Sequence, residues 1–415
     1  MSYQVLARRW RPQCFEDLIG QEVVVRTLRN SLATKEISHA YLFSGLRGVG
    51  KTTAARLLAK ALNCEHGPTP EPCGTCVACT DITAGRSLDV LEIDASSERK
   101  IDDMRELREI IRNAPLRDRY RVVILDEAHQ IYRDSWPVLL KMIEEPPAHV
   151  VFIFASTDRG AFPDTILSRC QQLDFRPISV ELIEERLGRV AQTEGFELGA
   201  GAGQLIARAA DGSLRDALSL LERVRAFGGD VIDERAVTEV LGLSPAEALL
   251  AIWRRLVEGD LAGVLALIRE EERLGRDLRA LYGQLVEVLE ALLLLACDPQ
   301  VKVPYPAAMR QALLESAGVV GAPLLLRLLQ LALEQRQLIA GAERPALAVT
   351  VAVGRLALWP RLRRVEELLA GASAGAEVAP APARTTARAA AISPPAATPP
   401  AAPSPGDPRS RLADA

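Results

Sequence analysis

The feature that most constrains this chain is a glycine-rich run at residues 45–52, Gly-Leu-Arg-Gly-Val-Gly-Lys-Thr, which fits the pattern G-x-x-x-x-G-K-[ST]. A short apolar run at residues 41–44 precedes it, and a helical pattern at residues 52–62 follows it. A strand, a glycine-rich loop and a helix in this order form a phosphate-binding loop, because the loop N–H groups and the helix N-terminus attract anions. An ordinary glycine-rich turn is the alternative, and the flanking strand and helix argue against it.

The loop predicts a set of nucleotide contacts. We expect the Lys51 ammonium to bridge the β- and γ-phosphates of ATP and the Thr52 hydroxyl to ligate Mg²⁺. The other nucleotide-binding residues expected in the loop and at the start of its helix are Gly45, Arg47, Gly48, Val49, Gly50 and Thr53.

A pair of carboxylates complements this loop. The apolar strand at residues 122–125 is followed directly by Asp126 and Glu127. Asp126, at the carboxyl end of the strand, can complete the Mg²⁺ shell, and Glu127 can orient or deprotonate an attacking water. Acidic residues at a solvated strand end are common, but beside a phosphate-binding loop they predict a nucleoside triphosphatase.

Five short apolar runs alternate with helical patterns, at residues 41–44, 89–93, 122–125, 150–155 and 171–175. This alternation predicts an α/β core with a five-stranded parallel sheet over residues 1–178. From Ser179 onward Leu, Ala, Arg and Glu recur at helical spacing, so we expect two all-α domains, at residues 179–242 and 243–369. Gly242 and the following Ser244-Pro245 mark the boundary between them, as a helix stop and a new start.

Composition limits the remaining classes. With 48% apolar and 25% charged residues among 415, most of the chain should fold, although residues 370–415 form a Pro/Ala-rich tail that we expect to be disordered. The formal charge of −4 excludes a polycation that coats nucleic acid. The N-terminus has no apolar signal region and no stretch approaches 18 uncharged apolar residues, so we expect a cytoplasmic protein.

Four of the seven cysteines form a cluster. They are Cys64, Cys73, Cys76 and Cys79, with the spacing C-x8-C-x2-C-x2-C. In a reducing compartment this spacing predicts one tetrahedral Cys₄ zinc site, which leaves no open position for a substrate and is therefore structural. An iron–sulfur cluster is the alternative, but the fourth cysteine lies upstream and no Cys-Pro follows.

Taken together, these residues resemble the γ/τ subunit family of bacterial DNA polymerase III, the AAA+ ATPases of the sliding-clamp loader. The resemblance is dense over residues 1–242 and looser up to about 369. It rests on the phosphate-binding loop, the four cysteines and a colinear series of motifs, namely residues 3–12, Gly20-Gln21, residues 39–44, residues 125–129, Leu139-Leu140-Lys141, Glu144-Glu145-Pro146-Pro147, Ser168-Arg169-Cys170 and residues 212–217.

The resemblance implies further site residues. Arg169 matches the family's arginine finger, which acts in trans on the nucleotide of the neighbouring subunit, and a guanidinium there stabilises developing phosphoryl charge. Arg215 matches the sensor of the helical lid, residues 179–242, where Ser213 and Asp216 can form a capping box. Thr157 matches the polar sensor beside the water, and adenine is expected near Val49 and an N-terminal segment from Ala7 to Pro12.

The family also implies partners. These are the δ and δ′ subunits and further γ/τ copies in a pentamer held by the collar (residues 243–369), the sliding clamp, and primer–template DNA, with Arg99, Lys100, Arg105 and Lys141 as candidates for phosphate contacts. A DNA-directed DNA polymerase activity would belong to the holoenzyme, because the chain shows no polymerase carboxylate constellation. The long τ form continues where this chain ends in its tail, and a natural short form and a truncation both remain open.

Two other functions remain alternatives. One is a nonhydrolysing scaffold such as δ′, which the intact Lys51 and Asp126-Glu127 disfavour. The other is a different AAA+ motor such as a Holliday-junction helicase, which the cysteine insertion and the two-part helical region disfavour.

Overall fold

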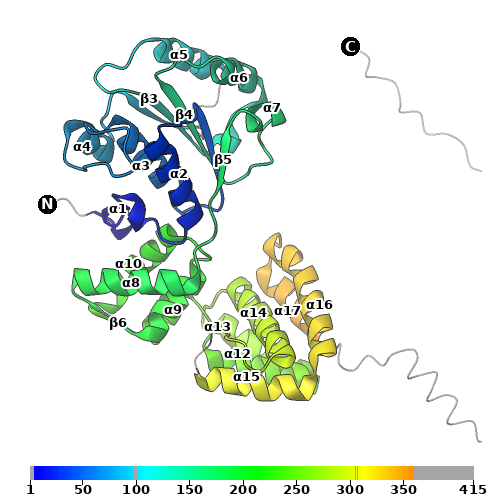
Figure 1. Ribbon diagram of the computed structural model, residues 1–415. Helices are drawn as coiled ribbons and strands as arrows, with labels where there is room; N and C mark the ends of the chain where they lie inside the picture. The colour runs from blue at the N-terminus through cyan, green and yellow to red at the C-terminus, as the bar shows by residue number, and fades with distance from the viewer. Residues whose placement is uncertain (1–3, 97–100, 304, 306, 359–415) are drawn as a thin grey trace, which may run out of the picture. The chain divides into compact units, whose positions relative to one another are not determined.

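The first part of the chain folds around one parallel sheet (Figure 1). The computed structural model describes residues 4–96, 101–303, 305 and 307–358. The sheet has the order β2-β3-β4-β1-β5, and all four neighbouring pairs are parallel, which confirms the predicted α/β core. The strands are β1 Ala40–Ser44, β2 Val90–Asp94, β3 Arg121–Asp126, β4 Val150–Ser156 and β5 Gln171–Asp174.

Helices cover both faces of this sheet, so the inner strands β1, β3 and β4 are buried along almost their whole length, whereas the edge strands β2 and β5 carry polar residues. Successive residues of a strand point to opposite faces: Tyr41 and Phe43 pack under α2 and α3, whereas Leu42 packs under α5, α6 and α7. These helices and the short α4 are α2 Glu22–Thr34, α3 Lys51–Asn63, α4 Val77–Ala84, α5 Ile101–Arg112, α6 Trp136–Glu144 and α7 Asp164–Leu167.

Residues 180–241 form a second, mainly helical cluster with its own buried core. Its helices are α8 Val180–Glu194, α9 Ala200–Ala209, α10 Leu214–Gly228 and α11 Glu234–Leu241. A two-residue parallel ladder, β6 Glu197–Leu198 with β7 Val231–Ile232, is a detail that helical periodicity did not predict, because two residues are too few to show a period of two.

The N-terminal segment packs into this helical cluster. α1, Leu6–Arg9, places the buried Leu6 in the helical core, and the indole Nε1 of Trp10 donates a hydrogen bond to Glu194 at 2.9 Å. A few residues later, Lys60 of α3 donates from Nζ to the carbonyl of Gln13 at 2.9 Å. The segment therefore bridges the α/β core and the helical cluster.

Six further helices form a third buried cluster: α12 Ala246–Glu258, α13 Leu261–Arg273, α14 Leu278–Cys297, α15 Ala307–Val320, α16 Ala322–Ala340 and α17 Pro345–Leu358. Gly242, with φ of 63°, ends α11 as predicted, and α12 begins after Pro245. α14 is long and apolar enough to cross a membrane by length and composition, with a mean hydropathy of 1.7. Its Leu and Val side chains are largely buried against α15, α16 and α17, which accounts for that apolarity.

The limits of the α/β core, the lid and the collar remain predictions. The tail at residues 370–415 lies outside the described residues, as does the last part of the expected collar.

Candidate nucleotide-binding site

The loop after β1 has a backbone that only glycine allows at three positions. Gly45, Gly48 and Gly50 have φ of 142°, 78° and 107°, which L-residues rarely adopt. A Cβ at Gly45 would also overlap the carbonyl oxygen of Phe175. The glycines of the motif are therefore required by the fold of the loop, and α3 begins immediately afterwards at Lys51.

Lys51 is the buried cation of the loop, with only 6% of the residue exposed. Its Nζ donates to the carbonyl oxygens of Gly45 and Leu46, at 2.8 and 2.7 Å. Burial lowers the pKa of Lys51, while the negative charges of Glu127 and Asp126 oppose that shift. Since Lys51 forms no ion pair with any residue in the described ranges, this partly desolvated ammonium fits an anionic ligand such as a nucleotide phosphate.

The hydroxyl and carboxylate predicted for Mg²⁺ lie together. Thr52, in the first turn of α3, donates from Oγ1 to Oδ2 of Asp126 at the end of β3, at 2.8 Å. The other carboxylate oxygen of Asp126 accepts the backbone N–H of Glu127 at 3.0 Å. Hydroxyl and carboxylate oxygens are the ligands that Mg²⁺ prefers, so this pair fits the ion.

Glu127 and Thr157 are joined by a residue to which the sequence assigned no role. Nδ1 of His129 lies 3.5 Å from Oε2 of Glu127 and 3.5 Å from Oγ1 of Thr157. Glu127 has φ of 47°, in the left-handed region, so its carboxylate follows the sharp turn after β3. His129 follows the two carboxylates by only two or three positions and closes the family motif at residues 125–129, and these were the sequence signals for it.

The helical lid closes on the loop through the start of α10. The backbone N–H of Arg215 lies 3.4 Å from the carbonyl oxygen of Gly48. Ser213 caps α10 as predicted, accepting the N–H of Asp216 at 3.2 Å. The reciprocal half of the capping box was wrong: the N–H of Ser213 donates to the carbonyl of Ala210 instead, because an Asp side chain is shorter than the Glu or Gln of that motif.

A cavity of about 320 Å³ lies between the loop, the N-terminal segment and the lid. This volume is within the range of small-ligand sites. Its lining includes almost all of the predicted nucleotide and magnesium residues: Ala7, Pro12, Arg47, Gly48, Val49, Gly50, Lys51, Thr52, Thr53, Asp126, Glu127 and Arg215. Gly45 is not among the lining residues but accepts from Lys51, and Thr157 contacts His129 outside the cavity.

The predicted adenine segment from Ala7 to Pro12 includes the lining residues Arg8 and Arg11, but sequence reasoning missed others, namely Leu18, Ile19, Ile178 and Leu218. Burial, together with the neighbouring positive charges of Arg56, Arg215 and Arg8, lowers the pKa of Arg11. The cavity therefore combines cationic side chains with an apolar wall.

Arg169 does not reach this cavity. It lies two residues before β5, and the register pairs Gln171 with Tyr41 and Asp174 with Ser44. Arg169 is therefore at the amino edge of the sheet, whereas the phosphate-binding loop leaves the carboxyl edge. The four paired residues of β5 alone separate the two edges by roughly 10 Å, at about 3.3 Å per residue.

Two of the four candidates for DNA contacts, Arg99 and Lys100, lie outside the described residues. Arg105 and Lys141 are exposed on α5 and α6, which pack together on one face of the sheet.

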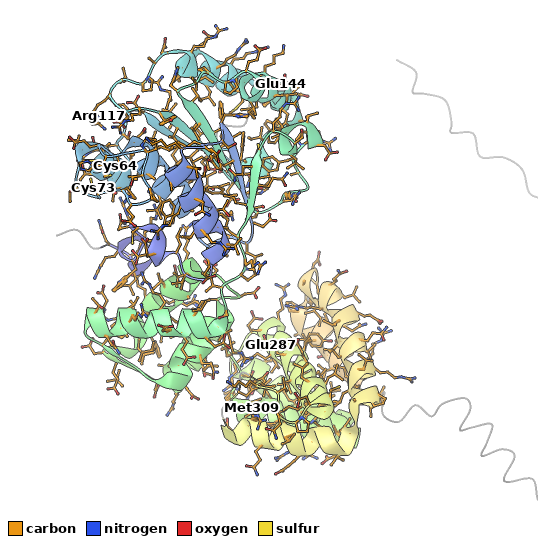
Figure 2. All side chains as sticks on the ribbon, in the orientation of Figure 1. Cys64, Cys73, Arg117, Glu144, Glu287 and Met309 are labelled. Atoms are coloured by element: carbon orange, nitrogen blue, oxygen red, sulfur yellow. The ribbon has the colours of Figure 1, made fainter. Side chains whose placement is uncertain are left out.

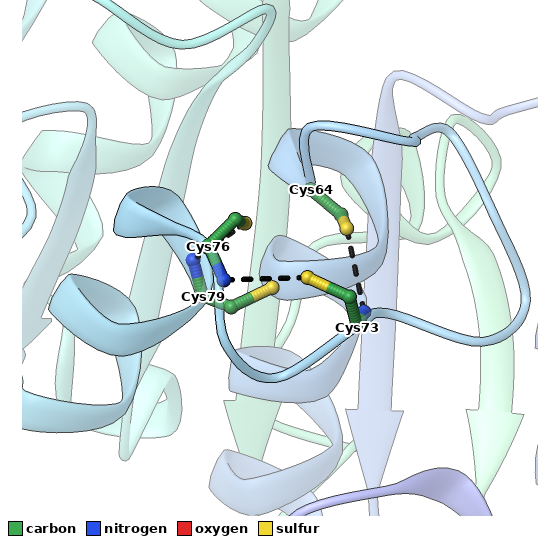
Figure 3. A group of neighbouring side chains, drawn as sticks. All are labelled: Cys64, Cys73, Cys76 and Cys79. Carbon is green, nitrogen blue, oxygen red and sulfur yellow. Dashed lines mark hydrogen bonds between the residues drawn. The ribbon is translucent and has the colours of Figure 1, made fainter.

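The four cysteines converge just after the helix that follows the loop (Figure 3). Their sulfur atoms all lie within 4.8 Å of one another. A tetrahedral zinc site with Zn–S bonds of about 2.3 Å needs sulfur–sulfur distances of about 3.8 Å, so modest closure completes it. Backbone N–H groups of Cys73, Cys76 and Cys79 point at Sγ of Cys64, Cys73 and Cys76, at 3.4, 3.3 and 3.5 Å.

The surroundings of the cluster suit thiolate ligands and tie it to the core. Hydrogen bonds from the backbone N–H groups of Cys76 and Thr75 lower the pKa of the Cys73 thiol to about 6, whereas burial raises that of Cys79. The guanidinium of Arg119 donates to the carbonyl oxygens of Cys64 and Glu65. The cysteine insertion is therefore anchored to the segment that leads into β3.

The sheet order, the glycine loop at the carboxyl end of β1, the carboxylates at the end of β3 and the helical lid define a P-loop protein of the AAA+ ATPase class. Three family profiles match in series: "DNA polymerase III, delta subunit" over residues 20–179, "DNA polymerase III clamp loader subunit, ATPase lid domain" over residues 182–230, and "DNA polymerase III subunits gamma and tau domain III" over residues 232–370.

Curated relatives agree. The chain is 46% identical to the DNA polymerase III subunit tau of Escherichia coli over 72% of this chain and 46% of that protein. It is 44% identical to the tau subunit of Salmonella typhimurium over 77% of this chain and 50% of that protein. It is 38% identical to the gamma subunit of Buchnera aphidicola over 73% of this chain and 82% of that protein. The chain belongs to the gamma/tau subunit family of DNA polymerase III.

The chain spans about half the length of the two tau subunits. Among solved structures, RuvB of Thermotoga maritima, titled a Holliday junction branch migration motor, is 22% identical with a TM-score of 0.43, over 59% of this chain and 79% of that chain.

Proposed function

We propose that this chain is the ATP-hydrolysing subunit of a clamp loader, in which ATP binding and hydrolysis drive the loading of a sliding clamp onto primed DNA. One observation carries the proposal: the phosphate-binding loop, the carboxylates of Asp126 and Glu127, and Arg215 of the lid all line a single cavity. Nucleotide in that cavity would touch both the loop and Arg215, so binding would stabilise the lid in its closed position.

The chain's own residues would divide the work of hydrolysis. Lys51 would leave the carbonyl oxygens of its loop for the phosphates, and Thr52 and Asp126 would hold Mg²⁺. Bound there, Mg²⁺ neutralises charge on the phosphates. Glu127 would orient or deprotonate the attacking water, with His129 and Thr157 fixing its carboxylate.

Arg169 would act on the nucleotide of a neighbouring subunit. The position of Arg169 at the far edge of the sheet supports this role, because the loop of its own chain lies at the opposite edge. Hydrolysis would then depend on assembly.

The cysteine cluster would hold structural zinc. Four converging thiols with N–H···S bonds support this choice, since four sulfur ligands leave no open position. Metal analysis of the purified chain should find about one zinc per chain, and iron or no metal would contradict the assignment.

The partners would be δ and δ′ subunits, further γ/τ copies, the clamp and primer–template DNA in the cytoplasm, with Arg105 and Lys141 among the contacts to phosphate. Exposed cations on two helices of one sheet face support a local, sequence-independent contact despite the net charge of −4.

An ATPase assay with and without clamp and primed DNA tests the proposal. We expect stimulation by both together, abolished ATP binding in Lys51→Ala, and retained binding without turnover in Glu127→Gln. A scaffold would show no turnover under any condition, and turnover of the Glu127→Gln chain at the wild-type rate would exclude Glu127 as the group that activates water.

A further inference from the structure

The motif Glu144-Glu145-Pro146-Pro147 has no part in the site described so far, yet its first residue contacts a proposed catalytic group. Oε1 of Glu144 lies 2.8 Å from Nη2 of Arg169, and both side chains are a little over one-third exposed. Figure 2 shows Glu144 at the outer end of α6, beside α7. The ion pair therefore joins the end of α6 to the turn that carries Arg169.

The position of Glu144 is unfavourable for its own helix. It is the last residue of α6, where the exposed carbonyl groups give the helix end a negative potential. A carboxylate there is destabilising unless a cation compensates it, and Arg169 supplies that cation.

Arg169 is held from a second side as well. Its Nη1 donates to the carbonyl oxygen of Thr165 at 2.8 Å and lies 3.3 Å from Oγ of Ser168. Within the described ranges, no hydrogen bond uses Nε of Arg169, so this N–H donor of the guanidinium is available to a ligand. A phosphate oxygen of a neighbouring subunit's nucleotide could accept from it.

The two anchors are placed by buried packing. Met142 and Ile143 of α6 and Ile166 of α7 belong to one buried cluster on the same face of the sheet. The spacing between Glu144 and Arg169 is therefore fixed by the core rather than by the flexible side chains alone.

We propose that Glu144 is a positioning residue that holds the Arg169 guanidinium in the orientation needed to reach a neighbouring subunit's nucleotide. This inference rests on the proposed role of Arg169 in trans. A free arginine side chain has many rotamers, and an ion pair formed before assembly reduces the entropy lost when the finger binds phosphate.

Mixed assemblies test the proposal. Wild-type chains are mixed with an excess of full-length Lys51→Ala chains, which cannot use their own site but still offer Arg169 to a neighbour, and two different tags select assemblies that contain both. The second change in the Lys51→Ala chain is then varied: none, Glu144→Ala, Glu144→Gln, Glu145→Gln or Arg169→Ala. Glu145 is the matched control, because it is the adjacent exposed carboxylate and has no ion pair in the part of the chain that the structure describes.

We expect Arg169→Ala to lower turnover per wild-type site by about 10³-fold. Glu144→Ala should lower it by about 1.5- to 5-fold, as an exposed ion pair of roughly 0.2–1 kcal/mol allows. Turnover with Glu144→Gln should lie between that with Glu144→Ala and that with the Lys51→Ala parent chain. Turnover with Glu145→Gln should equal that with the parent chain. The affinity for ATP should not change, and the effect of Glu144→Gln should shrink as salt rises toward about 0.5 M, because salt screens exposed charges.

The outcomes separate the two claims. If Arg169→Ala has no effect, the trans role fails and this inference fails with it. If Arg169→Ala lowers turnover but the Glu144 variants match Glu145→Gln, only the positioning role is overturned. A rise in turnover with Glu144→Ala would also overturn it, because Glu144 would then restrain the finger rather than present it.

Discussion

Gly48 offers a sharp test of how the lid meets the phosphate-binding loop. Its φ of 78° lies in the left-handed region, and a Cβ there would overlap Oγ of Ser213 and lie 3.1 Å from Cβ of Ser213 and 3.2 Å from Cβ of Arg215. Gly48→Ala must therefore either rotate Ser213 Oγ out of its N-cap hydrogen bond or move the start of α10 away from the loop. A misplacement of about 1 Å at a site of this kind can lower kcat/KM by about 10²-fold.

Backbone strain must be separated from this steric effect. A non-glycine residue in the left-handed region costs roughly 1–2 kcal/mol. Gly85 is the matched control, since it has φ of 72° and a Cβ added there would meet nothing within 4 Å. Gly85→Ala should lower the free energy of unfolding by a similar amount to the strain part of Gly48→Ala while leaving ATP binding unchanged.

The assay is a titration of each purified full-length chain with a fluorescent ATP analogue, followed by steady-state turnover and denaturant unfolding. We expect weaker binding and turnover only in Gly48→Ala, and partial recovery when Ser213→Gly is added, because glycine removes the overlapping atoms and costs an N-cap only a few tenths of a kcal/mol. Equal ATP affinity in Gly48→Ala and Gly85→Ala would refute the inference that the lid rests on Gly48.

Three other substitutions probe separate parts of the structure. Cys79→Ser should lose most of the bound zinc and lower the unfolding temperature, measured by metal analysis and calorimetry, with the isolated Cys297→Ser as a control that changes neither. Burial alone would raise the pKa of Asp89, but hydrogen bonds from the backbone of residues 116–118 and from Arg121 outweigh burial and lower that pKa. Because Asp89→Asn removes one partner of a buried ion pair, it should cost about 3–5 kcal/mol of unfolding free energy at neutral pH. This stabilisation is present above the ordinary aspartate pKa of about 3.9 and is lost as the pH falls through the lower folded value, so an unfolding difference that stays constant down to pH 2 would contradict it. His129→Ala should lower kcat several-fold with little change in ATP affinity, because His129 contacts both Glu127 and Thr157. An unchanged kcat would show that His129 does not help Glu127 to activate water.

The sequence by itself determined the parts of this protein whose chemistry is local. Residues 45–52 require a glycine-rich loop between a strand and a helix, and the five short runs located every strand of the sheet to within one residue at each end. The cysteine cluster was also predictable from the sequence, because four thiols within sixteen residues can come together through local folding alone. The family resemblance added Arg169, Arg215 and Thr157, which no spacing alone would have singled out.

Only the tertiary structure decided which distant residues meet. Arg215 reaches Gly48 because α10 packs against the N-terminal segment and the loop, and Glu144 reaches Arg169 because α6 and α7 share a buried face. These contacts join residues that are between 25 and 167 positions apart along the chain, so they depend on packing rather than on a local pattern. Local propensity sets each element, but hydrophobic burial sets how the elements lie against one another, and that arrangement places the charges of the site.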